Sequence, residues 1–445
     1  MTVALLSVRA ELTALLGESR VVTDPAACAA VAVDGKVPSA VVYPPTAELV
    51  AEVLHLASEH DLAVIPFRNG TKLSMGNPPR RYDLALSLKE LNQVWHYEPA
   101  DLTISVEPGM KFGDLQNFVG RHGLWLPLDP RGGAKASIGG IIAANAAGPL
   151  RQGYGGPRDM VLGLKIAATG GKILKTGGRV VKNVAGYDLS KLLIGSFGTL
   201  GVIVEANLKL YPKPAERATF AFEISTLDAA RNLRRSILRS PMDALRLALL
   251  DDSAIGLLDG AASGAGQNGL ELWMEVGGSH RVIERCERDL GQLAGAAGAM
   301  MARLEDAETA WERVSDLPLW LKEKYRDVTV LKAALPIAAG ETFLDQSQRA
   351  ALAGRVRAAV FAGVGFVHVC LLEEKLSEGL ADVVTHLRQA AGGLGGSLVI
   401  EHCPTELKAR VDVWGAPGDD IEAMRKMKSA WDPKGTLSPG RFLGF

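Results

Sequence analysis

The spacing of apolar residues along the first half of the chain predicts a mixed α/β domain. Residues 5–16 have the apolar spacing of a short amphipathic helix, and the apolar run 40–43 is strand-like. Two prolines end this run, and Thr46 follows as the expected N-cap of a helix that reaches about His60. A second strand-like run follows at 62–66, so this region predicts a strand–helix–strand unit. Further strands are predicted at 83–87, 102–106, 161–168 and 201–210.

The pattern changes after the prolines at positions 212 and 214. Residues 216–412 alternate strand-like runs with helical stretches, which are predicted near 227–240, 279–296, 349–359 and 376–391. Two halves of β-α-β type would form an antiparallel sheet with the helices on one face. The last residues contain a predicted helix at 420–431 and a turn, and we expect them to return to the first domain. The sequence therefore predicts an α+β protein divided into 1–214, 215–412 and a C-terminal segment, 413–445.

Composition and charge narrow the class of protein. Hydrophobic residues make up 47% of the chain and charged residues 22%, as is usual for a soluble globular protein. The formal net charge of −1 gives no bulk field that would attract nucleic acid or anionic lipid. No apolar run is long enough to span a bilayer, and the N-terminus lacks the features of a secretory signal. We therefore expect a cytoplasmic protein without a transmembrane segment that does not bind nucleic acid.

The chain has four cysteines, and none of them forms a CxxC pair: Cys28, Cys286, Cys370 and Cys403. A disulfide framework is therefore not expected, nor is an iron–sulfur cluster held by this chain alone. Buried, reduced thiols are the simpler interpretation.

Three glycine-containing segments are candidates for ligand binding. The first is the polar loop 68–74, which follows a predicted strand and contains Gly70. Such a loop can turn backbone N–H groups toward phosphate oxygens, although an ordinary polar turn has the same composition. The second is the run of small residues at 136–148, where glycines leave space for a flat ring or a diphosphate; a tightly packed core helix is the alternative. The third is 178–203, where Gly195, Gly198 and Gly201 recur every three residues.

One glycine motif is discounted. Residues 264–269 match G-x-G-x-x-G, but a dinucleotide fingerprint must leave a strand and open a helix. This run instead precedes the strand-like sequence LELWMEV, so we interpret it as a loop and do not expect a nicotinamide cofactor.

The ordered segments resemble the FAD-binding domain of the vanillyl-alcohol oxidase and p-cresol methylhydroxylase family. The resemblance includes the loop 66–74, the V-E-P-G run 106–109, the Gly-Gly-to-Gly run 139–148, the Tyr-Gly pair 154–155 and the strand 198–203. The matches run in order through about 38–212, and 432–441 resembles the family's closing motif. Within the family, residues 178–188 (GRVVKNVAGYD) resemble the FAD-binding E subunits of bacterial glycolate oxidases.

This resemblance implies a two-lobed FAD-binding domain at 1–214 and a ferredoxin-like cap at 215–412. It implies non-covalent FAD, because the loop 68–74 lacks the histidine to which several relatives attach the flavin. By position, it implies cofactor contacts at Arg68, Asn69, Gly70, Thr71, Lys72, Leu73, Ser74, Pro130, Ser137, Gly139, Gly140, Ala144, Asn145, Gly148, Tyr154, Gly155, Gly198, Gly201 and Ile203.

The substrate side departs from the family pattern. Catalytic relatives carry H-A-G-D-G-N-x-H, and here Phe361, Val364 and Phe366 replace the first His, the Asp and the Asn. The resemblance leaves four catalytic candidates, which are Lys332, His368, Glu401 and His402. No arginine matches the one that binds the substrate carboxylate, and with the first His lost we expect no stoichiometric metal. The same residues also fit a degenerate site that retains a few buried polar groups.

Two functions stay open on this evidence. The resemblance implies an FAD-dependent oxidoreductase subunit of a complex that oxidises glycolate or another small 2-hydroxy acid. Its partners would be a catalytic FAD subunit and an iron–sulfur subunit, through which the chain would lie in the cytoplasm or at the inner membrane. The alternative is a non-catalytic FAD-binding scaffold that assembles or stabilises the catalytic flavoprotein.

Overall fold

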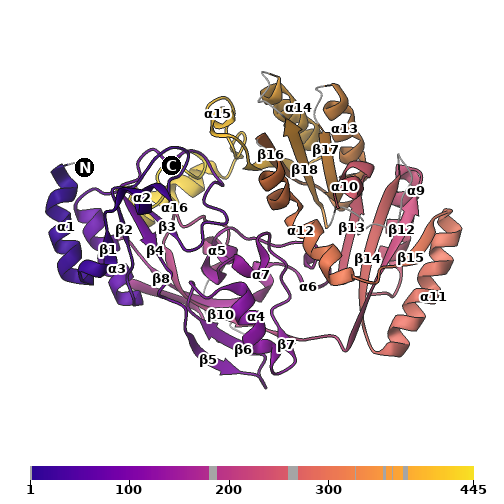
Figure 1. Ribbon diagram of the computed structural model, residues 1–445, viewed down its shortest axis with the longest axis horizontal. Helices are drawn as coiled ribbons and strands as arrows, with labels where there is room; N and C mark the ends of the chain where they lie inside the picture. The colour runs from indigo at the N-terminus through magenta and orange to yellow at the C-terminus, as the bar shows by residue number, and fades with distance from the viewer. Residues whose placement is uncertain are drawn as a thin grey trace. The chain divides into compact units, whose positions relative to one another are not determined.

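The chain folds into two compact units, seen in the computed structural model of Figure 1. The structure describes residues 3–179, 188–258, 269–325, 327–353, 357–362, 364–373 and 379–445. The first unit contains Met1–Ala146, Gly156–Pro212 and Ala416–Phe445, and the second contains Ala147–Gly155 and Lys213–Gly415. The second unit therefore takes one short segment from the continuous first domain that the sequence predicts. The reason is local, because the Gly153 N–H donates to the Leu245 carbonyl at 3.1 Å.

A four-stranded sheet forms one half of the first unit. Its order is β1-β2-β4-β3, and β4 is parallel to both β2 and β3. These strands are β1 (Val21–Val22), β2 (Ala40–Val42), β3 (Val64–Phe67) and β4 (Leu84–Ser87). Helix α3 (Ala47–Glu59) packs its buried residues in one core with this sheet. It begins as predicted at Thr46, whose hydroxyl accepts the Leu49 N–H at 3.2 Å.

A five-stranded antiparallel sheet forms the other half, in the order β5-β6-β10-β8-β9. Its strands are β5 (Val94–Glu98), β6 (Thr103–Val106), β8 (Val161–Ala167), β9 (Ile173–Gly177) and β10 (Val202–Lys209). The strands predicted at 83–87, 102–106, 161–168 and 201–210 are thus confirmed to within one residue. The other elements of the unit are α1 (Val3–Leu16), α2 (Pro25–Ala29), α4 (Phe112–Gly120), β7 (Leu124–Trp125), α5 (Ile138–Ala143), α7 (Pro157–Met160), α8 (Ser190–Leu193), β11 (Tyr211–Pro212) and α16 (Ile421–Trp431).

The second unit is built on an eight-stranded antiparallel sheet, in the order β15-β12-β14-β13-β17-β18-β16-β19. Its strands are β12 (Glu216–Ile224), β13 (Arg246–Leu250), β14 (Leu270–Gly278), β15 (Met300–Arg303), β16 (Asp327–Ala334), β17 (Arg357–Ala362), β18 (Phe366–Glu373) and β19 (Ser397–His402). Its helices are α6 (Arg151–Tyr154), α9 (Leu227–Arg239), α10 (Asp252–Leu257), α11 (His280–Ala297), α12 (Ala307–Lys324), α13 (Gly340–Ala353), α14 (Leu380–Gly393) and α15 (Thr405–Lys408).

This topology is two β-α-β-β-α-β halves placed edge to edge. In each half the first strand lies between the third and the fourth, which is the ferredoxin-like arrangement. The second strands of the two halves, β13 and β17, pair antiparallel and join the halves into one sheet. The α+β fold class predicted from the sequence is therefore confirmed.

Two details of the second unit were predicted wrongly. A helix was expected at 349–359, but α13 ends at Ala353 and Arg357–Ala362 is the strand β17. Helices were expected on one face only, whereas α12 buries Trp311, Val314 and Leu317 on the face opposite α9 and α11 (Figure 1). The sequence did not reveal α12 because Pro318 stands inside it and usually marks a helix boundary.

Candidate functional site

The loop that follows β3 forms the first wall of a hollow in the first unit. Gly70 has a φ of +69°, and the Leu73 N–H donates to the Gly70 carbonyl at 2.9 Å. The N–H groups of Gly70 and Thr71 donate to no group in the part of the chain that the structure describes. A left-handed residue beside such N–H groups is the geometry of a backbone anion site. These residues line a cavity of about 110 Å³.

Arg68 anchors the beginning of this loop. Its Nε donates to the Gly109 carbonyl at 3.1 Å, which ties the loop to the V-E-P-G turn. Burial lowers the pKa of the Arg68 guanidinium, and the nearby Asp114 carboxylate opposes this shift. The side chain stays cationic at neutral pH, since an arginine pKa remains far above 7. The loop therefore adds a positive charge to its backbone donors.

Helix α5 forms the second wall, and its two glycines have different roles. Ser137 caps the helix, and its Oγ accepts the Gly140 N–H at 3.3 Å. A Cβ on the buried Gly139 would lie 2.6 Å from the Cβ of Pro108, so Gly139 is required for packing against the V-E-P-G turn. Gly140 is exposed, and a Cβ there would meet only the Ser137 Oγ, at 3.1 Å. The expectation that both glycines make room for a ligand is thus corrected for Gly139.

The turn before β10 forms the third wall. Gly198 has a φ of +68°, and a Cβ on it would lie 2.9 Å from the Cγ of Pro66, at the end of β3. The N–H groups of Gly195 and Phe197 donate to the Ile142 and Ala143 carbonyls at 3.1 and 2.9 Å. This turn is therefore fixed to α5 by backbone hydrogen bonds and to β3 by close packing.

The three walls enclose one connected space. A second cavity, of about 90 Å³, shares Arg68, Ser137, Gly140 and Phe197 with the first. The predicted cofactor residues that line one or both cavities are Arg68, Asn69, Gly70, Thr71, Lys72, Leu73, Ser137, Gly139, Gly140, Ala144, Gly198, Gly201 and Ile203. Three other predicted residues are described but lie outside these two linings, namely Ser74, Pro130 and Asn145. Gly148, Tyr154 and Gly155 belong to the second unit. Cofactor contact stays a prediction for all nineteen residues, of which thirteen line a cavity.

The lining residues that sequence reasoning did not name as cofactor contacts include Ser196, Phe197, Ser438 and Arg441. Phe197 has a φ of +54°, a backbone conformation that no sequence pattern announced. Ser438 and Arg441 lie in the run 432–441, whose likeness to a closing motif was the available signal.

The second unit brings three of the four catalytic candidates together. The antiparallel register of β16 and β18 places Lys332 opposite His368. The Glu401 carboxylate lies between them, 3.8 Å from the Lys332 Nζ through Oε1 and 3.7 Å from the His368 Nε2 through Oε2. These side chains are only 21%, 10% and 14% exposed for Lys332, His368 and Glu401, so water screens their charges weakly. The fourth candidate, His402, stands opposite Val330 beyond a register shift in β19.

The ring of Phe366 lies close to two basic side chains. Phe366 is one of the residues that depart from the family pattern. The Lys332 Nζ lies 4.2 Å and the Arg151 Cζ 4.8 Å from the centre of its ring. Each distance is within the range of a cation–π interaction. The sequence did not single out Arg151, because its segment 147–155 lies far from β18 along the chain. The cluster therefore contains one lysine, one arginine, one carboxylate and one imidazole.

Other candidates proved structural or lie outside the described residues. The Asp188 carboxylate accepts the Ser190 N–H at 3.1 Å, a local helix-start contact. Lys182 and most of the phrase 178–188 lie outside the described residues, as do 264–268 of the discounted glycine motif and position 363. Among the side chains that the structure describes, no group of three or more His, Cys, Asp or Glu is arranged to hold a metal ion. No helix in the described ranges is long and apolar enough to cross a membrane.

Comparison with known proteins shows which families this chain is similar to. The family described as "FAD binding domain" matches residues 38–177, and the one described as "FAD linked oxidases, C-terminal domain" matches residues 213–442. The chain is 29% identical to glycolate oxidase subunit GlcD of Bacillus subtilis over 91% of this chain and 89% of that protein. It is also 29% identical to D-2-hydroxyglutarate dehydrogenase of Xanthomonas citri, over the same shares of the two chains.

The fold has a solved counterpart of similar size. The structure of p-cresol methylhydroxylase with substrate bound aligns with a TM-score of 0.77 at 16% identity, over 99% of this chain and 97% of that one. The predicted vanillyl-alcohol-oxidase type of fold is thereby confirmed. The first unit carries an FAD-binding domain. The match to the C-terminal domain of FAD linked oxidases, residues 213–442, extends over more than half of the sequence. This chain is an FAD-dependent oxidoreductase of the FAD-linked oxidase family.

Proposed function

We propose that FAD is held in the hollow of the first unit, with its pyrophosphate against the loop 68–74. The N–H groups of Gly70 and Thr71 and the charge of Arg68 support the position of the pyrophosphate. The exposed Gly140 leaves room for flat or extended parts of the cofactor. The loop offers no histidine, cysteine or tyrosine side chain, so we propose that FAD is bound without a covalent link.

We further propose that the chain oxidises a short 2-hydroxy acid as a subunit of a complex. The Lys332, His368 and Glu401 cluster is the observation that carries this proposal. Two relatives that match nearly the whole chain bear names for glycolate and 2-hydroxyglutarate oxidation, which supports this substrate class. FAD supplies a two-electron acceptor for the hydride on the hydroxyl-bearing carbon. The carboxylate of the substrate would pair with Lys332 and Arg151, and His368 would accept the hydroxyl proton while Glu401 stabilises the imidazolium.

The electrons would then pass to partners, which we propose are a second flavoprotein subunit and an iron–sulfur subunit. The name of the Bacillus relative describes a subunit, which supports assembly into a complex. The four cysteines of this chain are buried and form no disulfide, and none of them belongs to a CxxC pair, so the cluster would belong to a partner. The complex would work in the cytoplasm.

A second candidate function is a non-catalytic FAD-binding scaffold. Phe366 favours it, because an apolar ring between two cations occupies a position where catalytic relatives have a polar residue. The charge of Lys332 is also partly neutralised by Glu401. In that case the cluster would stabilise the sheet, and a partner would perform the chemistry.

If FAD occupies this hollow, Gly140→Val should weaken FAD binding and raise the Kd about tenfold or more. The valine side chain would enter the lined space, where Gly140 now has none. Titration of the apoprotein with FAD, followed by flavin fluorescence, measures the change. Gly170→Val is the control, because nothing lies within 4 Å of a Cβ at that position. Normal affinity in the Gly140 variant would show that the cofactor lies elsewhere.

Non-covalent attachment predicts that acid precipitation releases the yellow colour into the supernatant, with FAD as the released species. Chromatography of the supernatant identifies the flavin. Colour retained in the protein pellet would contradict the absence of a covalent link.

The residues that replace the family's catalytic motif predict that the isolated, FAD-loaded chain oxidises glycolate slowly. Its rate should be on the order of a hundredfold below that of the complex, since each missing transition-state interaction lowers the rate by about that factor. Anaerobic stopped-flow mixing with glycolate or D-lactate follows flavin bleaching. Rapid stoichiometric bleaching by the isolated chain would refute dependence on partners.

One variant separates the two candidate functions. In the reconstituted complex, Lys332→Met should lower turnover about a hundredfold if the cluster binds substrate. Lys324→Met, which removes an exposed lysine at the end of α12, is the matched control. Unchanged turnover in the Lys332 variant would favour the scaffold.

A further inference from the structure

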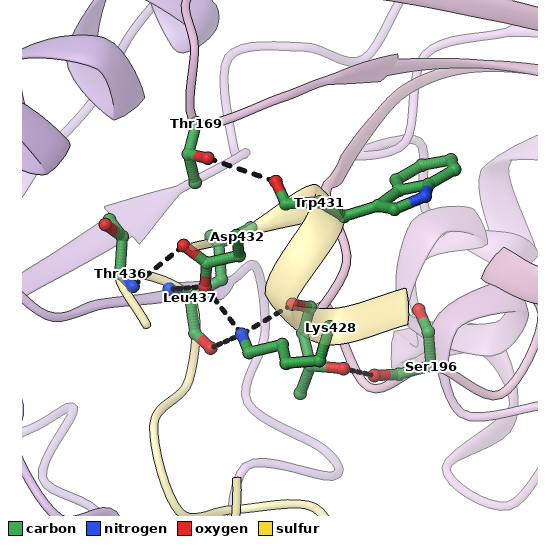
Figure 2. A network of polar contacts seen from close by, with 8 residues as sticks. Thr169, Ser196, Lys428, Trp431, Asp432, Thr436 and Leu437 are labelled. Carbon is green, nitrogen blue, oxygen red and sulfur yellow. Dashed lines mark hydrogen bonds and ion pairs between the residues drawn. The ribbon is translucent and has the colours of Figure 1, made fainter. Parts of the chain in front are cut away.

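A buried ion pair fixes the C-terminal segment of the first unit. The Lys428 Nζ lies 2.5 Å from the Asp432 Oδ2, and the two side chains are 7% and 0% exposed. The same Nζ donates to the Thr199 carbonyl at 2.8 Å and to the Leu437 carbonyl at 2.9 Å, so all three of its donors are used (Figure 2). The Asp432 carboxylate also accepts the N–H groups of Thr436 and Leu437, at 2.9 and 2.8 Å. The pair is therefore a fully satisfied network.

This network joins two walls of the cofactor hollow. Thr199 belongs to the turn that forms the third wall, directly after Gly198. The segment after Asp432 runs beside β3, because the Val64 N–H donates to the Thr436 carbonyl at 2.7 Å and the Ser438 N–H to the Val64 carbonyl at 2.9 Å. β3 leads into the loop 68–74 of the first wall. The Lys428/Asp432 pair thus sets the position of the third wall, the turn before β10, relative to β3, the strand that leads into the first wall.

Arg441 continues this connection into the loop itself. Its Nη2 donates to the Leu73 carbonyl at 2.6 Å and also to the Met75 carbonyl. The residue is 7% exposed and lines the same cavity as Gly70. The Asn77 N–H donates to the Arg441 carbonyl at 3.1 Å, so contacts run in both directions. With the Leu73 and Met75 carbonyls held by Arg441, the loop cannot turn over and lose its N–H groups from the hollow.

Stability alone is a poor explanation for these buried charges. Taking an ion pair out of water costs several kcal/mol per ion, and apolar replacements of similar size are often neutral or stabilising. Burial lowers the pKa of Lys428 and of Arg441, which shows that both charges are held against a desolvation cost. What the charges provide is directional contact to six backbone carbonyl or N–H groups around the hollow, which apolar side chains cannot give.

We propose that residues 432–441 form a further wall of the pyrophosphate site, with Arg441 as a positioning residue for the loop 70–75. The Lys428/Asp432 pair holds that wall against β3 and the Thr199 turn. This inference rests on the proposed position of FAD in the first unit. It assigns the control of cofactor affinity to the C-terminal segment, far along the chain from the glycine segments.

The test compares FAD affinity with the stability of the apoprotein in the full chain. Arg441→Met should raise the Kd for FAD about tenfold or more, and should raise the Kd for ADP, measured by competition, by a similar factor. Lys426→Met is the matched control, because Lys426 is an exposed lysine of the preceding helix α16, outside the proposed wall. The control should leave both constants unchanged.

A double variant separates positioning from folding. Lys428→Met combined with Asp432→Asn removes both charges, and the single amide oxygen can still accept one of the Thr436 and Leu437 N–H groups. The melting temperature of the apoprotein should therefore fall by only a few degrees, while the Kd for FAD rises about tenfold. A lower melting temperature with unchanged FAD affinity would overturn the proposal.

Two further outcomes are decisive. If Arg441→Met weakens FAD but not ADP, the residue does not act on the pyrophosphate loop and the proposal fails. If the wild-type chain binds neither FAD nor ADP, the proposed cofactor position fails first, and this result is recognised without any variant.

Discussion

The cofactor hollow depends on backbone segments that approach one another with no side chain between them. Gly198 faces Pro66 and Gly139 faces Pro108 at distances where a Cβ would clash. Hydrogen bonds from the turn at 195–197 to α5 then fix these approaches. Because backbone positions are set by the sheets, the N–H groups of the loop 68–74 are held ready for an anion before it binds. The glycines of the first unit are therefore required for two reasons, close packing at Gly139 and Gly198 and open space at Gly140.

The second unit holds the charged cluster in place through the register of its sheet. Two ferredoxin-like halves share one sheet, and its register sets Lys332 beside His368. Glu401 neutralises part of the charge, and Phe366 holds the Lys332 and Arg151 cations near one ring. This arrangement provides fixed positive charge without a described set of metal ligands. We propose that this positive charge binds an anionic substrate. The cluster has fewer groups that could ionise a substrate hydroxyl than the motif H-A-G-D-G-N-x-H would provide.

Much of the fold followed from the sequence, because local signals agree with the final structure. The Thr46 N-cap and the apolar spacing after it predicted α3, and the strands β2, β4, β6, β8 and β10 were predicted to within one residue. Local signals failed where the tertiary structure decided the outcome. Pro318 concealed α12, and residues 357–359 were assigned to the helix expected at 349–359, although they belong to the strand β17, which pairs with β13 and β18.

The candidate site divides in the same way. Ordered glycines identified three walls of the hollow, but not which glycine serves packing, since that depends on Pro108. Arg151 and Arg441 were missed because each reaches its partners from a distant part of the chain. The contact of Arg441 with Leu73 spans 368 residues. No periodicity or short motif records such a contact.

Hydrogen–deuterium exchange of the apo and FAD-loaded chain tests the central claim most directly, namely that four segments of the first unit hold the cofactor. The account predicts slower exchange on FAD binding at 68–75, 137–144, 195–203 and 436–441, because ligand contact suppresses local opening. Peptides from α1, at the N-terminus of the same unit, serve as an internal reference. Protection that omits the loop 68–75 or the segment 436–441, with FAD bound at one equivalent, would contradict the account.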